Sequence, residues 1–157
     1  MSIELLETRH EYRLGHAGSV LVVIWLTEPT VAAIRALTAH HLALASVHGK
    51  VTLLSVIQKA AGNPAPEVRE AIREQSAAVR EVRLGSVVVV QMKGIGAVFV
   101  RSYLALMSIV STEPLRSAKT LDDAANEIRG LQGQDAATRA NATLAEALSD
   151  FVNRPQA

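Results

Sequence analysis

The sequence contains no cysteine, which excludes disulfide bonds, thiolate nucleophiles and cysteine-ligated zinc sites. Aromatic residues make up only 3% of the chain, so its core must be built from aliphatic side chains. Neither sign of charge is in large excess, because 16 Lys and Arg stand against 15 Asp and Glu, for a formal net charge of +1. A chain with this balance lacks the broad positive field that draws proteins onto phosphate backbones, and we expect no nucleic-acid partner.

The first residues, MSIELLETRHEYR, lack an apolar run long enough for a signal-peptide core, and they carry acidic residues early. Secretory signals have a basic start followed by an apolar segment. We therefore expect the protein to stay in the cytoplasm.

What the chain does contain is an alternation of short β-rich runs and longer helical patterns, within 157 residues of which 49% are hydrophobic. Alternation of this kind predicts an α/β fold, with helices packed on a mixed, mostly parallel sheet. The expected elements are a hairpin around Gly15–Ser19 with Val20–Leu26 as a central strand, a helix over Thr30–Val47 ended by Gly49, a strand over Val51–Ile57, a helix from Pro66 ended by Gly85, a strand over Val87–Val90, a helix over Ala97–Thr112, an edge strand over Leu115–Lys119, a helix with Thr120 as N-cap, and a last helix over Ala136–Val152.

The stretch SVVVVQMKGIGAVFV, residues 86–100, permits three interpretations: part of a membrane span, a phosphate-binding turn, or a buried strand that turns into a helix. A span over Val87–Val110 has the required length. It would place Lys93 and Arg101 near the bilayer centre, at a cost of ~2.5 kcal/mol or more for each. We therefore expect no membrane span.

The phosphate interpretation depends on Lys93, Gly94 and Gly96, which lie between a predicted strand and a predicted helix. Backbone N–H groups at such a turn attract anions. A dinucleotide fingerprint, however, requires a third glycine where this chain has Phe99, and no P-loop motif is present. A tight turn without a ligand is the simpler interpretation, and an anionic or lipid-like small ligand at these three residues is the alternative.

Three of the five histidines, His40, His41 and His48, lie on one predicted helix. His41 and His48 are seven residues apart, which is ~10 Å along a helix and too far for one tetrahedral ion. Both fall on the apolar side of the helix, so we expect partly buried, hydrogen-bonded imidazoles. The pattern predicts no metal site and no cofactor.

No nucleophile motif of the G-x-S-x-G type is present. Ser55 and Ser86 fall on or beside predicted strands, where hydroxyl groups bond locally. The carboxylates between Glu67 and Glu81 alternate with arginines, which is typical of a solvated helix face. We therefore expect a protein without enzyme activity.

From about Tyr12 to Leu131 the chain resembles a STAS domain, and more closely the SpoIIAA-like relatives of that family, which include anti-sigma-factor antagonists. The resemblance rests on the hairpin followed by alternating helices and strands, on SVVVVQMKGIG entering a helix, and on LRSAKTLDDAANEI near the end. It implies a STAS-like sheet and a non-enzymatic regulatory module that binds another protein.

The chain departs from that family at the phosphorylation site. Phosphorylated antagonists carry Asp-Ser-Ser/Thr-Gly at the start of the helix after the middle strand, whereas Gln58–Pro66 reads QKAAGNPAP and contains no hydroxyl group. The resemblance therefore implies a module without a phosphorylation switch. It places the partner-binding surface at Lys59, Asn63, Glu67, Val68 and Arg69.

The last predicted helix lies beyond the STAS-like part, so we expect a domain over residues 1–133 and a helical extension over residues 134–157. Leu144, Leu148 and Phe151 recur at spacings of four and three and form an apolar stripe that must dock. The predicted helix over Ala97–Thr112 offers a matching apolar arc. We therefore expect docking on the same domain or, by preference, self-association as a homodimer through six residues: Phe99, Tyr103, Met107, Leu144, Leu148 and Phe151.

Overall fold

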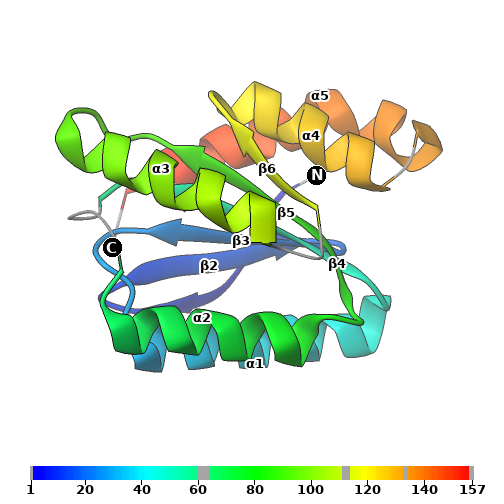
Figure 1. The fold of residues 1–157 in the computed structure, drawn as a ribbon. Helices are drawn as coiled ribbons and strands as arrows, with labels where there is room; N and C mark the ends of the chain where they lie inside the picture. Colours follow the sequence, from blue (N-terminus) through cyan, green and yellow to red (C-terminus); the bar gives the residue numbers. More distant parts are fainter. Residues whose placement is uncertain (1, 60–63, 111–113, 133, 156–157) are drawn as a thin grey trace.

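The computed structural model describes residues 2–59, 64–110, 114–132 and 134–155. These residues form an α/β fold with a single mixed sheet (Figure 1). The elements in chain order are β1 (Glu4–Thr8), β2 (Tyr12–Ala17), β3 (Val20–Trp25), α1 (Val31–His48), β4 (Val51–Ile57), α2 (Pro66–Val79), β5 (Arg83–Val90), α3 (Ile95–Val110), β6 (Leu115–Ala118), α4 (Leu121–Gln132) and α5 (Gln134–Asn153).

The strands lie in the sheet in the same order as in the sequence. The pairs β1–β2 and β2–β3 are antiparallel, and β3, β4, β5 and β6 run parallel to one another. The predicted hairpin joins β2 to β3 through Gly18, whose φ of 55° is a conformation that glycine adopts readily. The expected mixed, mostly parallel sheet that starts with a hairpin is therefore confirmed.

Helices cover both sides of this sheet (Figure 1). One side, here called the α1–α2 face, packs against α1 and α2, and the α4–α5 face packs against α4 and α5. The predicted central strand β3 serves both cores, because Val22 and Ile24 join the α4–α5 core while Leu21 and Val23 join the α1–α2 core. Helix α3 lies beside β5 and β6.

The apolar stripe of α5 docks on its own chain. Leu144, Leu148 and Phe151 are buried in the α4–α5 core together with strand residues of β3, β4 and β5. The stripe is thus not exposed to a second copy, and the expected 134–157 extension shares a core with the rest of the fold. Gly15 in β2 makes the contact possible, because a Cβ there would lie 2.7 Å from the Ile3 side chain and 2.8 Å from the Phe151 ring.

Arg13 in β2 holds the end of α5. It is buried, and its guanidinium donates hydrogen bonds to the carbonyl oxygens of Arg154 at 2.7 Å and Val152 at 3.1 Å. The same group lies over the Phe151 ring, 5.2 Å from the ring centre. A cation here satisfies carbonyl groups at the helix end that have no partner within the helix.

The sequence prediction misplaced the start of β5. Helix α2 ends at Val79, and β5 begins at Arg83, which pairs with Val51 of β4. Gly85 therefore lies inside the strand instead of ending the helix. A Cβ at Gly85 would lie 3.0 Å from the Leu131 side chain, so glycine allows α4 to approach β5 closely.

Strand β1 was not predicted at all. It pairs with β2 at the edge of the sheet through an irregular register between Leu5 and Glu7. The predicted N-cap of α4 is confirmed, because Thr120 Oγ1 accepts from Asp123 N at 3.1 Å. Helix α1 has a cap of the same kind that was not predicted, in which Thr30 Oγ1 accepts from Ala33 N at 3.1 Å.

The strand–turn–helix interpretation of residues 86–100 is confirmed. Strand β5 ends at Val90, Gly94 turns the chain with a φ of 88°, and α3 begins at Ile95. Within the described residues, none of the helices combines the length and the apolar composition that a membrane crossing requires.

Candidate functional site

The ends of β3, β4 and β5 meet at one edge of the sheet, here called the carboxyl edge, which is on the left in Figure 1. The carboxyl ends of parallel strands are where α/β proteins commonly bind other molecules. Gln58 Nε2 donates to Gln91 Oε1 at 3.2 Å, and Gln91 N donates to the Ile57 carbonyl oxygen at 2.9 Å. These bonds hold the last residues of β4 and β5 together, so Lys59 and Lys93 follow neighbouring strands.

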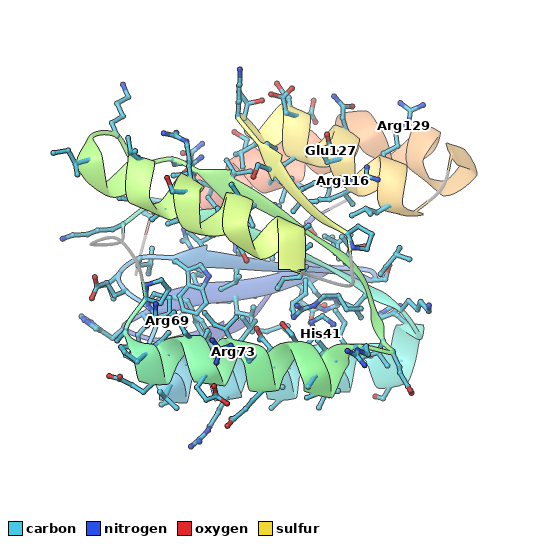
Figure 2. The ribbon with its side chains drawn as sticks, viewed as in Figure 1. His41, Arg69, Arg73, Arg116, Glu127 and Arg129 are labelled. Carbon is cyan, nitrogen blue, oxygen red and sulfur yellow. The ribbon has the colours of Figure 1, made fainter. Side chains whose placement is uncertain are left out.

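The residues predicted to bind a partner divide into three groups. Lys59 and Glu67 are exposed, and Arg69 is half-buried on the first turns of α2 (Figure 2). Val68 is only 7% exposed and packs in the α1–α2 core, so it cannot contact a partner as predicted. The prediction failed there because a helix that begins at the carboxyl edge must still turn one side of its first turn toward the sheet. Asn63 lies outside the described residues.

The predicted ligand turn lies open at the surface. Lys93 and Gly94 are exposed and Gly96 is half-buried. Gly94 also accepts a backbone hydrogen bond from Val98 N at 3.3 Å. A small molecule at this turn would rest on an open surface, whereas small-molecule sites normally enclose most of their ligand.

The predicted self-association residues of α3 are Phe99, Tyr103 and Met107. Their side chains lie outside the described part of the structure. The three predicted residues of α5 lie in the α4–α5 core, as described above.

A polar cluster that the sequence did not predict joins β1, β2 and α1. Its members, here called the Glu7 cluster, are Glu7, Arg9, Tyr12 and His40. The Tyr12 hydroxyl donates to Glu7 Oε2 at 2.5 Å, and His40 Nε2 lies 3.1 Å from the same oxygen. Arg9 Nη1 lies 3.4 Å from Glu7 Oε1. The partners lie up to 33 residues apart in the chain, so no local spacing could reveal them.

The environment of the Glu7 cluster favours the ionised carboxylate. Burial opposes the charge on Glu7, but the hydrogen bonds from Tyr12 and Arg9 and the positive charges of His40 and Arg9 outweigh it and lower the pKa of Glu7. Burial and the hydrogen bond to Glu7 raise the pKa of Tyr12, which keeps its proton. The carboxylate is occupied by contacts with these three side chains, so the cluster fastens β1 to α1.

His41 differs from the prediction of a hydrogen-bonded imidazole. It is fully buried between α1 and the sheet (Figure 2), and neither ring nitrogen has a hydrogen-bond partner among the described residues. Burial, assisted by the positive charge of Arg83, lowers the pKa of His41 to about 4. His48, predicted to be partly buried, is exposed at the end of α1. Its ring lies 6.5 Å from that of His16.

Metal-binding chemistry finds no support in the described ranges. Across residues 2–59, 64–110, 114–132 and 134–155, no group of three His, Asp or Glu side chains is placed to hold an ion.

Comparison with protein-family models gives no match for this chain, and comparison with curated proteins gives none either. The exposed residues of the carboxyl edge are therefore the basis for a functional interpretation.

Proposed function

We propose that the protein is a non-enzymatic interaction module of STAS-like fold that binds another protein through its carboxyl edge, without a phosphorylation switch. The observation that carries the proposal is the exposure of Lys59 after β4 and of Glu67 on the first turn of α2, where Arg69 is half-buried. This is the place at which the STAS resemblance puts the partner. The chain-order sheet behind a hairpin is compatible with that resemblance.

The surface at the start of α2 has the charges that specific recognition needs. It carries the exposed carboxylate of Glu67 and the half-buried cation of Arg69, and its backbone is supported by Val68 and Ala71 in the core beneath. One turn further, Glu70 and Arg73 pair with each other at 2.9 Å (Arg73 is labelled in Figure 2). Charges on a rigid base select partners by complementarity.

The position of the nearest serine supports the absence of a phosphorylation switch. Ser55 is half-buried within β4, where it lies opposite Val23 on one side and Val88 on the other. A kinase would have to open three paired strands to reach it. Incubation with an anti-sigma-type serine kinase should leave this region unmodified, and stoichiometric phosphate on Ser55 in a mass spectrum would contradict the proposal.

Affinity capture from the cells that produce the protein tests the proposed function. We expect one stoichiometric protein partner that the wild-type chain retains and the Lys59→Glu/Arg69→Glu variant loses. Lys50→Glu is the matched control, because Lys50 is exposed just before the start of β4, at the opposite end of the strands from the carboxyl edge. Retention by all three chains, or by none, would contradict the proposal.

Thermal denaturation separates this function from a small-ligand carrier at Lys93, Gly94 and Gly96. A ligand present at about 100 times its dissociation constant stabilises a fold by ~2.7 kcal/mol. Inorganic phosphate and a medium-chain fatty acid are suitable probes for an anionic and a lipid-like ligand. A saturable increase in stability of that size with either compound would contradict the interaction module and support a small-ligand carrier.

A further inference from the structure

Helix α3 turns an apolar row toward solvent at the carboxyl edge. Ile95 is 75% exposed and Val98 is 59% exposed, whereas Ala97 and Val100 of the same turns are buried. Residues three apart are neighbours on a helix surface, so Ile95, Val98 and Arg101 form one continuous row. Single exposed aliphatic residues are common on protein surfaces, but two adjacent ones at the start of a helix form a small patch.

The chain segment that contains this row carries only positive charge. Lys93 precedes it and Arg101 ends it, and both are exposed. The sequence between Arg83 and Glu113 contains no Asp or Glu. Lys59 adds a further exposed cation near Lys93, because the Gln58–Gln91 hydrogen bond joins the ends of β4 and β5.

We propose that the row Ile95–Val98–Arg101, with Lys93 and Lys59 at its rim, docks an acidic amphipathic segment of a protein partner. This inference rests on the proposed function and names the chemistry of the partner. Apolar side chains of the segment cover Ile95 and Val98, and its carboxylates meet the three cations. A basic segment would bring like charges together, which costs binding free energy and so enforces specificity.

A protein segment fits this surface better than a membrane does. Stable attachment to a bilayer requires two strong signals, such as two acyl chains or one chain with a polybasic patch. Two aliphatic side chains and three cations fall short of that requirement. They match the size of a local anchor in a protein interface, where a few buried side chains carry most of the binding energy.

Photo-crosslinking in the producing cells tests the inference. A photoreactive phenylalanine analogue replaces Ile95 in the full chain, and in a second chain it replaces Val47, which is 76% exposed at the far end of α1. We expect the Ile95 position to form an adduct with a protein peptide that contains apolar residues and a net negative charge. The Val47 position should not form this adduct. An adduct with a basic peptide, equal adducts at both positions, or no adduct at Ile95 in a folded chain would overturn the inference.

A synthetic peptide copied from the adduct then gives the affinity. Its binding should weaken about tenfold with Ile95→Asp, as expected for an interface anchor. Lys93→Glu should weaken it about fivefold and reduce its dependence on salt. Val47→Asp should bind like wild type, and undiminished binding by Ile95→Asp would overturn the inference.

Two further arms separate this inference from its alternatives. Vesicles of phosphatidylserine and phosphatidylcholine should not sediment the protein, and sedimentation that Ile95→Asp abolishes would assign the row to a membrane instead. Affinity capture with Ile95→Asp distinguishes the two proposals. A partner retained by that variant but lost by Lys59→Glu/Arg69→Glu would leave the proposed function intact and refute the docking row. A wild-type chain that retains no protein would refute both.

Discussion

Arg13 and His41 are both buried polar side chains, one on each face of the sheet, but their surroundings differ. Arg13 on the α4–α5 face donates to two carbonyl oxygens at the end of α5 and lies over an aromatic ring. His41 on the α1–α2 face has no hydrogen-bond partner among the described residues. The positive charge of Arg83 acts on its imidazole and, together with burial, disfavours protonation.

The difference shows that the consequence of burial depends on the partners a polar group finds. A cation that satisfies the carbonyl groups of a helix end stabilises the element it touches. An imidazole without partners stays neutral, because the protonated form would be desolvated and repelled. The α4–α5 face should therefore be insensitive to mild acid, and the α1–α2 face should be the one that weakens.

The largest effect is expected from Phe151→Ala on the α4–α5 face. Phe151 is fully buried, and removing a buried phenylalanine ring leaves a cavity that costs about 3–5 kcal/mol of unfolding free energy. Urea denaturation measures the loss. Val47→Ala, at an exposed site, should change stability by no more than about 0.5 kcal/mol. A loss below about 1 kcal/mol for Phe151→Ala would mean that α5 docks loosely, contrary to the structure.

A smaller, pH-dependent effect is expected from His41→Leu. The folded pKa of about 4 lies below the ordinary value of 6.5, so between these values the unfolded chain binds a proton that the folded chain does not. Protonation of His41 therefore leaves the unfolding free energy unchanged above pH 6.5. Below that pH it lowers the unfolding free energy, by ~2 kcal/mol at pH 5. Urea denaturation at pH 7 and pH 5 should show this loss in wild type and a smaller one in His41→Leu. The control His48→Leu, exposed on the same helix, should keep the wild-type pH dependence.

The third effect concerns the buried cation. Arg13→Leu removes two hydrogen bonds from a charged donor and should cost about 1–2 kcal/mol. Hydrogen exchange should become faster at the backbone amides of residues 149–153 and stay unchanged in α1. Arg73→Leu, which removes an exposed cation paired on α2, should cost little by comparison. Equal acceleration in α1 and α5 would show that Arg13 supports the whole fold and not one helix end.

The smallest effect is expected from Glu7→Gln, which should lower stability by about 0.5–1 kcal/mol at pH 7. Because the folded pKa of Glu7 is lowered, its contribution is present above the unfolded pKa of 4.5 and is lost as the pH falls through the folded value. The unfolding free energy should therefore fall more steeply between pH 5 and pH 3 in wild type than in the variant, as measured by urea denaturation at each pH. Glu4→Gln on the same strand is the control, and an identical slope for wild type and Glu7→Gln would argue against the cluster.

Local patterns predicted most elements of this fold, and tertiary pairing explains the exceptions. The continuous apolar run of β3 and the cap of α4 are properties of neighbouring residues, so the sequence reveals them. Strand β1 has the weak pattern ELLET, and its conformation depends on pairing with β2. Gly85 resembles a helix stop until the pairing of Arg83 with Val51 places it in a strand.

The environments of individual side chains were harder to predict than the elements. Helix α1 is apolar on nearly every side, from Ala36 to Val47, so a helical wheel does not distinguish buried His41 from exposed His48. Val68 and Glu67 are adjacent in the first turn of α2, yet Val68 is buried and Glu67 is exposed. Lys93 could be proposed as a binding residue because it lies between a strand and a helix, and Lys59 because the STAS resemblance places a partner there. The Glu7 cluster depends on contacts between distant elements.

The meeting of Ile3, Gly15 and Phe151 has a consequence for how the chain folds during synthesis. The bond from Arg13 to the Arg154 carbonyl oxygen spans 141 positions of the chain. Contacts of such long range form late and slow folding. While the ribosome is still translating α4, β2 and β3 are complete, but the helix that covers their α4–α5 side does not yet exist. A nascent chain paused there presents bare aliphatic strands, a form that is prone to aggregate and that chaperones would need to shield until α5 emerges.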